Sequence, residues 1–319
     1  MLKRLGLRAG WLAALLSVLL AGCGGEGARR FSGSHLGDAG GGGSLTYAIA
    51  ADPGDLDPLR AATVSAQVVT RQIFEPLVES LDGPYNGPRD RRGLASGWAH
   101  SRDYRVWSLR LRTGIRFQDD APLNAEAVVA NAERWISDPV GQQLLPGLAA
   151  ADAPSPNEVR LILAVPDRNL PRRLSDPRLG IVSPPALSNL GGLGHAFTRS
   201  QRAGSGPFEL QRRSADVLVL QRYRNWWGSR HGLGPAIDSL RFQLVAEPGL
   251  RAADLARGEV RVAADLPPGT AAQLQRDPLL TAEGLGSGHA VGFERSVRGI
   301  GGWRPAPLSG VWVTLLVGG

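Results

Sequence analysis

The sequence predicts an α/β fold in which mixed sheets are flanked by helices. Runs with an apolar residue at every second position alternate along the chain with runs whose apolar residues recur at the helical spacing of three or four. The first kind is typical of strands with one buried face, and it occurs in residues 45–50, 106–112, 158–165, 217–222 and 237–245. The second kind is typical of helices, and it predicts helices in residues 66–77 and 250–257 besides the one described below. The chain of 319 residues is also longer than one hydrophobic core usually supports, so more than one core is expected.

The clearest strand pattern covers residues 106–112. Its polar members face one side, and its apolar members on the other side are Trp107, Leu109 and Leu111. A turn at residues 113–114 follows, after which Ile115 and Phe117 resume the alternation. The pattern predicts a strand, a turn and a second short strand.

A helix is predicted to begin after Asn124, because an asparagine side chain can accept a hydrogen bond from a backbone N–H of the first turn. One face of this helix is apolar, formed by Val128, Val129, Ala132, Trp135 and Ile136. The pair Asp138-Pro139 ends it, since a residue before proline disfavours the helical conformation. We expect the apolar faces of the strands and the helix to share one core, formed by Trp107, Leu109, Leu111, Phe117, Val128 and Trp135.

The first 22 residues have the pattern of a lipoprotein signal peptide. A basic start is followed by a short apolar run, and Leu20-Ala21-Gly22-Cys23 follows that run. We therefore expect lipidation at Cys23, with a small buried cysteine as the alternative. Residues 23–44 are rich in glycine and are expected to act as a flexible tether, with order beginning near Leu45. Cys23 is the only cysteine, which excludes a disulfide within the chain.

The charge of the chain comes from arginine rather than lysine. The formal net charge is +7, and Lys3 is the only lysine. The arginines are interspersed with acids, as in residues 89–92, which is typical of a solvated surface. We therefore expect no nucleic-acid partner.

The stretch from Leu94 to Val128 resembles a block of the family 5 solute-binding proteins of ABC importers, the oligopeptide-, dipeptide- and nickel-binding proteins. The matching positions are Leu94-Ala95, Trp98, Trp107, Leu109, Leu111-Arg112, Gly114, Phe117, Pro122 and Ala125-Glu126-Ala127-Val128. Two residues depart from the family pattern: Asp120 replaces a turn glycine and Ala127 replaces an acid. Further matches are Leu56-Asp57-Pro58, residues 74–78, Gly204-Ser205-Gly206-Pro207-Phe208, residues 225–228, and residues 258–267, where Arg261 replaces an acid.

The resemblance implies a type II periplasmic-binding-protein-like lobe. An N-terminal lobe is expected in residues 45–71 plus 181–293, with residues 72–180 as an inserted subdomain. After Phe293 the similarity ends, and residues 294–319 form a divergent tail. The second lobe of the family is thus expected to be largely missing, as in a C-terminally truncated chain.

The resemblance also implies a ligand cleft lined by the loop after the Leu-Asp-Pro turn. The candidate contacts are Ala61, Ala62, Thr63, Val64 and Ser65, together with Phe208 and Trp226. An ordinary solvent loop is the alternative for residues 61–65. Packing inside the protein is the alternative for the pair Trp226 and Trp227.

No catalytic residue, metal site or cofactor is expected. The histidines lack metal-ligand spacing: His35, His100, His195, His231 and His289. Ser205 lies in Gly-Ser-Gly rather than in a nucleophile elbow. Glycine runs such as residues 191–194 lack the strand and helix that surround a phosphate site.

By resemblance, the chain is expected to be an exported, lipid-anchored and monomeric solute-binding component of an ABC importer. It would bind a peptide or related small solute and deliver it to permease subunits in the membrane, without catalysis. The alternatives are a truncated, binding-incompetent remnant or adaptor lipoprotein, and an exported lipoprotein hydrolase. Without a second lobe, weak or absent peptide binding is expected.

Overall fold

The computed structural model describes residues 43–79, 93–193, 202–231, 235, 237–274, 280–284 and 291–295. The predicted signal peptide, the lipidation site Cys23, the tether up to residue 42 and the tail from residue 296 lie outside these residues. Within them, no helix is long and apolar enough to cross a membrane.

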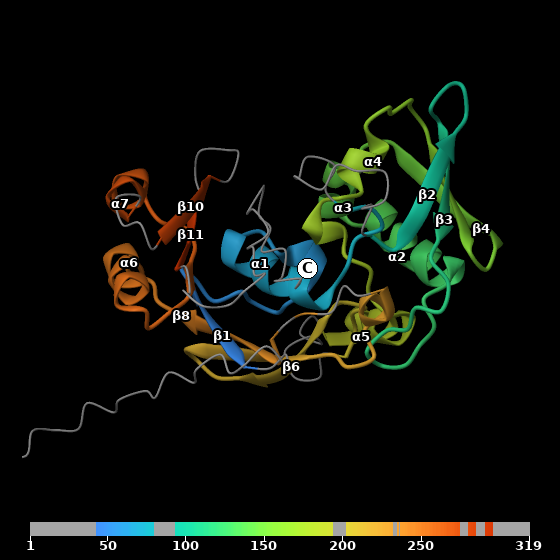
Figure 1. The fold of residues 1–319 in the computed structure, drawn as a ribbon. Coiled ribbons are helices and arrows are strands. Elements are labelled where there is room, and N and C mark those ends of the chain that lie inside the picture. The colour runs from blue at the N-terminus through green and yellow to red at the C-terminus, as the bar shows by residue number, and fades with distance from the viewer. Residues whose placement is uncertain are drawn as a thin grey trace, which may run out of the picture. The chain divides into compact units, whose positions relative to one another are not determined.

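The described strands form two sheets (Figure 1). The larger has seven strands in the order β10-β11-β9-β1-β8-β7-β6. Its central strand, β1 (Ser44–Ile49), pairs in parallel with β8 (Ser239–Leu244) on one side and β9 (Val262–Ala263) on the other. The remaining strands pair antiparallel, and they are β6 (Phe208–Arg213), β7 (Val217–Arg222), β10 (Leu280–Gly284) and β11 (Val291–Arg295).

The smaller sheet is antiparallel throughout, in the order β2-β3-β5-β4. Its strands are β2 (Ala95–His100), β3 (Val106–Leu111), β4 (Leu148–Ser155) and β5 (Glu158–Leu163). Helix α2 (Ala125–Ser137) packs against β4 and β5, and the short α3 (Pro139–Leu144) follows it. The strands of this sheet lie between residues 72 and 180, whereas those of the larger sheet flank that interval. The boundaries of an inserted subdomain remain a prediction.

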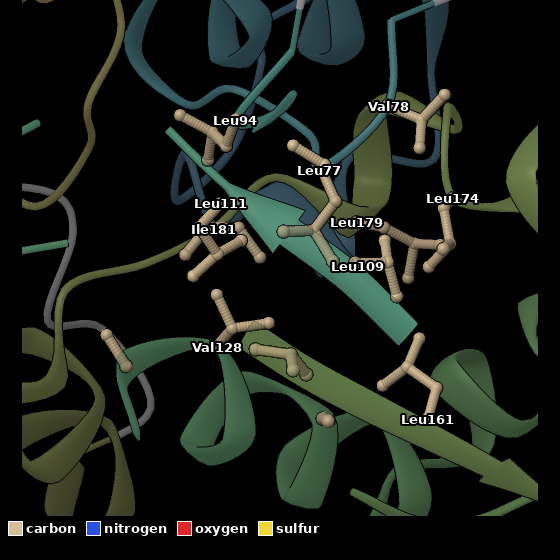
Figure 2. Packing of buried hydrophobic residues seen from close by; sticks show 14 of the residues in the cluster. Leu77, Val78, Leu94, Leu109, Leu111, Val128, Leu161, Leu174, Leu179 and Ile181 are labelled. Atoms are coloured by element: carbon tan, nitrogen blue, oxygen red, sulfur yellow. The ribbon is translucent and has the colours of Figure 1, made fainter. Parts of the chain in front are cut away.

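The core expected from the strand and helix patterns is confirmed. Trp107, Leu109, Leu111, Phe117, Val128 and Trp135 all belong to one cluster of buried residues. Figure 2 shows Leu109 and Leu111 of β3 in this cluster with Val128 of α2, Leu161 of β5 and leucines of other segments. The cap is also as predicted, because Asn124 Oδ1 accepts a hydrogen bond of 2.9 Å from Ala127 N.

The central strand of the larger sheet is buried on both faces. Leu45, Tyr47 and Ile49 pack with α1 (Val64–Ile73) in a second core, whereas Ala48 faces a third core with Leu255 of α6 (Pro248–Arg257). Sheets with parallel strands are usually covered in this way. The other described helices are α4 (Leu170–Arg173), α5 (Pro184–Leu193) and α7 (Pro268–Leu274).

Two sequence-based expectations are corrected. The helix expected to extend to Leu77 ends at Ile73, and Phe74 is extended at φ −117 and ψ 135. Pro76 explains the early end, because proline disfavours a helical conformation of the residue before it. Ile115 and Phe117 are buried as expected but form no strand, since only Arg116 makes an isolated bridge, to Pro122.

Candidate functional site

Three parallel strand ends meet at one edge of the larger sheet. Beyond β8 and β9, the chain continues hydrogen bonding to β1: Val245 N donates to Ile49 O at 2.9 Å, and Ala264 N to Ala48 O at 3.3 Å. The carboxyl ends of β8, β1 and β9 therefore lie in a row. In α/β sheets, ligands bind outside the carboxyl ends of parallel strands, where connections leave in different directions. We refer to this row as the carboxyl edge.

A buried guanidinium joins two of these strand ends. Arg251 of α6 is only 1% exposed. Its Nε donates to Ala264 O at 3.1 Å and its Nη2 to Asp265 O at 2.5 Å, after β9. Its Nη1 donates to Val245 O at 2.7 Å and to Ala246 O at 2.8 Å, after β8. Burial lowers the pKa of Arg251, while Asp265 and Glu247 oppose this effect. The hydrogen bonds compensate for the loss of hydration that burial causes.

The backbone at Asp265 is held in the left-handed region, with φ of 58. Few residues other than glycine adopt this conformation, although aspartate and asparagine tolerate it better than most. Such strain persists only where surrounding contacts impose it, and it concentrates at functional positions. At Asp265 the bond from Arg251 to the carbonyl oxygen is one such contact.

Helix α1 begins beside the end of β1. Ser65 Oγ accepts a hydrogen bond of 3.3 Å from Ala51 N, two residues after the strand. Thr63 caps the helix, since its Oγ1 accepts from Ala66 N at 3.1 Å. The first turn of α1 thus adjoins the carboxyl edge.

The predicted contacts at residues 61–65 are only partly a loop. Ala62 and Thr63 are exposed. Ala61 is buried at the end of a 3-10 turn (Pro58–Arg60), and Val64 and Ser65 belong to α1, with Ser65 buried. The expected loop therefore exposes chiefly Ala62 and Thr63. The cause is the cap at Thr63, which starts the helix two residues before the predicted start.

The other predicted contacts lie inside the protein. Phe208 is fully buried in the second core, so its side chain offers no surface to a solute in this conformation. Trp226 is partly buried against the first core, and Trp227 is buried within it. This arrangement matches the packing alternative for the two tryptophans.

Both indoles bond to the carboxylate of Glu75, a partly buried residue. Trp227 Nε1 donates to Oε2 at 2.9 Å and to Oε1 at 3.1 Å, and Trp226 Nε1 donates to Oε1 at 3.3 Å. Ser205 Oγ donates to Oε2 at 2.8 Å. Burial raises the pKa of Glu75 to about 7 despite these donors and the nearby Arg71, which all lower it. Glu75 thus joins the end of α1, the turn before β6 and the tryptophan segment.

A shallow hollow of about 310 Å³ lies elsewhere, on β2, β3 and β5. Its lining includes Trp98, Arg110 and Glu158. None of the predicted contacts lies there. Within the described residues, no group of three or more histidine, cysteine, aspartate or glutamate residues is arranged to hold a metal ion.

Sequence analysis did not identify Arg251, Asp265 or Glu75 as site residues. Arg251 and Leu255 are four apart on the predicted helix, which places Arg251 on the apolar side and was a usable signal. Glu75 lies in a matched motif, but a motif does not report burial. No local pattern marks the conformation of Asp265.

Comparisons with known proteins agree on one family. The family model of the bacterial extracellular solute-binding proteins, family 5 Middle, matches residues 91–296. The glutathione-binding protein GsiB of Escherichia coli O1:K1 is 30% identical over 238 residues, which are 73% of this chain and 44% of that protein. The chain thus spans less than half the length of this curated relative.

The comparison with solved structures agrees with the sequence comparison. The chain is similar to NikA from Brucella suis in complex with Fe(III)-EDTA, with a TM-score of 0.62 and 25% identity, covering 76% of this chain and 48% of NikA. It also resembles DppA from Helicobacter pylori in complex with the peptide STSA, with a TM-score of 0.63 and 20% identity, covering 76% and 50% of the two chains. The second likeness shows the fold alone, a type II periplasmic-binding-protein lobe.

Proposed function

The chain belongs to family 5 of the bacterial extracellular solute-binding proteins, and from this membership we propose that it is the solute-binding component of an ABC importer. It binds a peptide or related small solute and delivers it to permease subunits, without catalysis. The observation that carries the proposal is the carboxyl edge, where β8, β1, β9 and the first turn of α1 converge. A relative supports the solute class, since it is a glutathione-binding protein.

The contacts we propose are at the exposed start of α1. Ala62 and Thr63 are exposed next to the end of β1. Ala61 is buried, with its N–H bonded to Pro58 O and its carbonyl oxygen to Gln67 Nε2, so it supports the site rather than contacting the solute. Trp226 and Phe208 support the site by packing rather than by direct contact.

A thermal-shift screen with the purified chain tests the function. The probes are glutathione, the tetrapeptide Ser-Thr-Ser-Ala, Fe(III)-EDTA, nickel chelates and neutral sugars. A solute at a hundred times its Kd stabilises the folded state by about 2.7 kcal/mol, which raises the melting temperature measurably. A rise with any small solute supports binding. If no probe raises the melting temperature, the binding-incompetent or adaptor alternative replaces the proposal.

Matched variants test the location. Ala62→Arg puts a long charged side chain at the proposed edge and should abolish the shift. Ala99→Arg adds the same side chain at an exposed position of β2 and should leave binding unchanged. Equal effects of the two variants would refute the proposed location.

We also propose that the protein is exported and held at the membrane by lipid on Cys23. The support is the lipobox pattern behind a basic start and an apolar run. Cys23→Ala should yield an unprocessed or unanchored precursor in membrane fractionation. Since Cys23 is the only cysteine, the change removes no disulfide. Migration and fractionation identical to the wild type would refute lipidation.

A further inference from the structure

We propose that one face of the larger sheet lies against the anionic headgroups of the membrane to which the chain is tethered. This inference goes beyond solute binding and rests on the export and the lipid anchor at Cys23 proposed above. Three observations carry it: a row of arginines on that face, the pairing of the acids beside the row, and the place where the segment from Cys23 enters the sheet.

The face in question is the one turned away from the second core. Alternate residues of the strands pack in that core, and they include Leu220 of β7, Leu240 of β8 and Val262 of β9. Because side chains alternate along a strand, Val219, Arg241 and Arg261 face the opposite side. These three residues are partly exposed, so solvent reaches that side of the sheet. We refer to the side that bears Arg212, Val219, Gln221, Arg241, Thr46 and Arg261 as the open face.

Three arginines form one row across the open face. Arg212 of β6 is the register partner of Val219, which pairs with Arg241 of β8. Arg241 in turn pairs with Thr46 of β1, whose carbonyl oxygen accepts from Arg261 N at 2.9 Å. Neighbouring strands lie about 4.8 Å apart, so the row from β6 to β9 is about 19 Å wide. Cations spread over this width fit an extended anionic surface better than one small anion.

The acids beside the row already have partners. Glu209 pairs with Arg202 at 3.2 Å, and Glu259 pairs with Arg257 at 2.9 Å. By contrast, the guanidinium groups of the row make no ion pair or hydrogen bond within the part of the chain that the structure describes. Asp216, in the turn between β6 and β7, is exposed and offsets one of these charges. Together these groups leave the row with a net positive charge.

The segment from Cys23 enters the sheet close to this row. Gly43 O accepts a hydrogen bond of 2.9 Å from Asp238 N, which fixes the chain beside β8 just before β1 begins. Thr46, in the row, lies three residues further on, about 10 Å along the strand. A glycine-rich segment as long as residues 24–43 is expected to span roughly 25 Å. A lipid on Cys23 would therefore hold the open face near the headgroups.

The chemistry of arginine suits such a contact. Its planar guanidinium binds phosphate oxygens through paired N–H groups. At physiological salt the attraction acts over about 8 Å. Each basic residue near an anionic membrane surface strengthens binding roughly fivefold. A lipid anchor combined with a basic surface holds a protein more firmly than one acyl chain alone. The carboxyl edge lies at the opposite ends of β1 and β8 and stays free for the solute.

Vesicle binding tests the contact without the lipid anchor. The chain from residue 23 onward, made with Cys23→Ala so that no lipid is added, is mixed with vesicles of phosphatidylcholine and phosphatidylglycerol or of phosphatidylcholine alone. We expect cosedimentation with the phosphatidylglycerol vesicles only, weakened by added salt. Arg212→Gln, Arg241→Gln and Arg261→Gln combined should weaken this binding roughly a hundredfold.

Matched variants separate the open face from net charge and from folding. Arg102→Gln, Arg110→Gln and Arg168→Gln combined remove the same charge from exposed positions on and beside the smaller sheet, and binding should stay nearly unchanged. Gln221→Arg adds a cation to the open face and should tighten binding roughly fivefold, which a folding defect cannot do. Ala99→Arg, on β2, should not tighten it.

Each outcome supports or overturns the membrane contact. Loss with the row variant together with a gain in Gln221→Arg supports it. Absence of binding to phosphatidylglycerol vesicles, or equal losses in the two triple variants, overturns it. If sodium phosphate displaces the chain more than sodium chloride of equal ionic strength, the row is a site for a free anion and the contact is likewise overturned. Because this assay uses no lipid anchor, its result is independent of the fractionation experiment that tests Cys23.

Discussion

The two sheets differ in how their strand neighbours relate to chain order. In the smaller sheet, β2 pairs with β3 and β4 with β5, and each pair is consecutive in the chain. In the larger sheet, the central β1 pairs with β8 and β9, which come from the other end of the described residues. The smaller sheet has one face on a core, as the alternating burial of β3 shows, whereas β1 packs on both faces. The comparison shows that consecutive antiparallel pairs follow from chain order, whereas the parallel pairing of β1 joins segments that no local pattern connects.

Buried hydrogen bonds between segments of the two sheets couple the stability of one sheet to that of the other. Gln118 Nε2 donates to Phe208 O at 2.8 Å, and Asn131 Nδ2 donates to Val182 O at 2.8 Å. These bonds are buried, and breaking one leaves a polar group without a partner. We therefore expect a single cooperative unfolding transition rather than one for each sheet.

The largest expected effect is in the core of the smaller sheet. Trp107→Ala and Phe117→Ala each remove a large side chain that is at most 4% exposed, and each should cost about 3–5 kcal/mol of unfolding free energy. Phe242→Ala, in the larger sheet, should cost about as much. Denaturant unfolding followed by fluorescence and by circular dichroism measures all three. Two separate transitions, with only one shifted by each variant, would show that the sheets fold independently.

The next largest effect on stability is expected at Glu75, which links the end of α1 to Ser205 and the tryptophan segment. Burial raises its pKa from an ordinary value near 4.5 to about 7, so the folded protein takes up a proton that the unfolded chain releases between these pH values. Stability from this group is therefore greatest below about pH 4.5 and is lost as the pH rises through 7, by about 3 kcal/mol at most. Melting temperatures recorded between pH 4 and 8 measure this loss of stability with rising pH.

Two variants test whether Glu75 causes this dependence of the melting temperature on pH. Glu75→Gln cannot titrate, so this contribution should disappear whatever the absolute stability. Ser205→Ala removes a donor that lowers the pKa of Glu75, so the transition should move to higher pH. An unchanged slope in Glu75→Gln would assign the pH dependence to other groups.

A smaller effect is expected at the close contact between the turn before β6 and the end of α1. A Cβ at Gly204 would overlap the carbonyl oxygen of Ile73, so Gly204→Ala should cost about 1–3 kcal/mol. Gly97→Ala, in β2, has nothing within 4 Å of the added carbon and serves as the matched control. Equal stability of both variants in urea unfolding would show that the segments separate easily.

The smallest expected loss of stability is local and concerns helix α2, which packs against the smaller sheet. Asn124→Ala removes the cap of α2 and should cost about 1 kcal/mol. Asn124→Ser or Asn124→Asp should retain most of the stability, since these side chains also cap helices. Loss of stability with all three variants would show that Asn124 acts through something other than its cap.

Much of the fold and less of the site could be predicted from the sequence. The strands β1, β3, β5, β7 and β8 and the helices α2 and α6 were predicted within a few residues, because their side-chain periodicity is a local property. Strands β2 and β4 of the smaller sheet were missed. Leu148–Ser155 is mostly alanine and polar residues and becomes a strand by pairing with β5. The tryptophan segment and residues 61–65 were singled out by resemblance, whereas their contacts were not predictable.

The sequence by itself determined the family, the capped helix and the shared core of Trp107, Phe117 and Val128, because these depend on residues close together in the chain. Only the tertiary structure decided that Arg251 is buried, that Asp265 is held at a positive φ and that Glu75 lies among donors. A charged side chain can leave water only where distant carbonyls or indoles replace its hydration. In this protein those partners come from strand ends and segments far apart in the sequence, so no local sequence pattern predicts them.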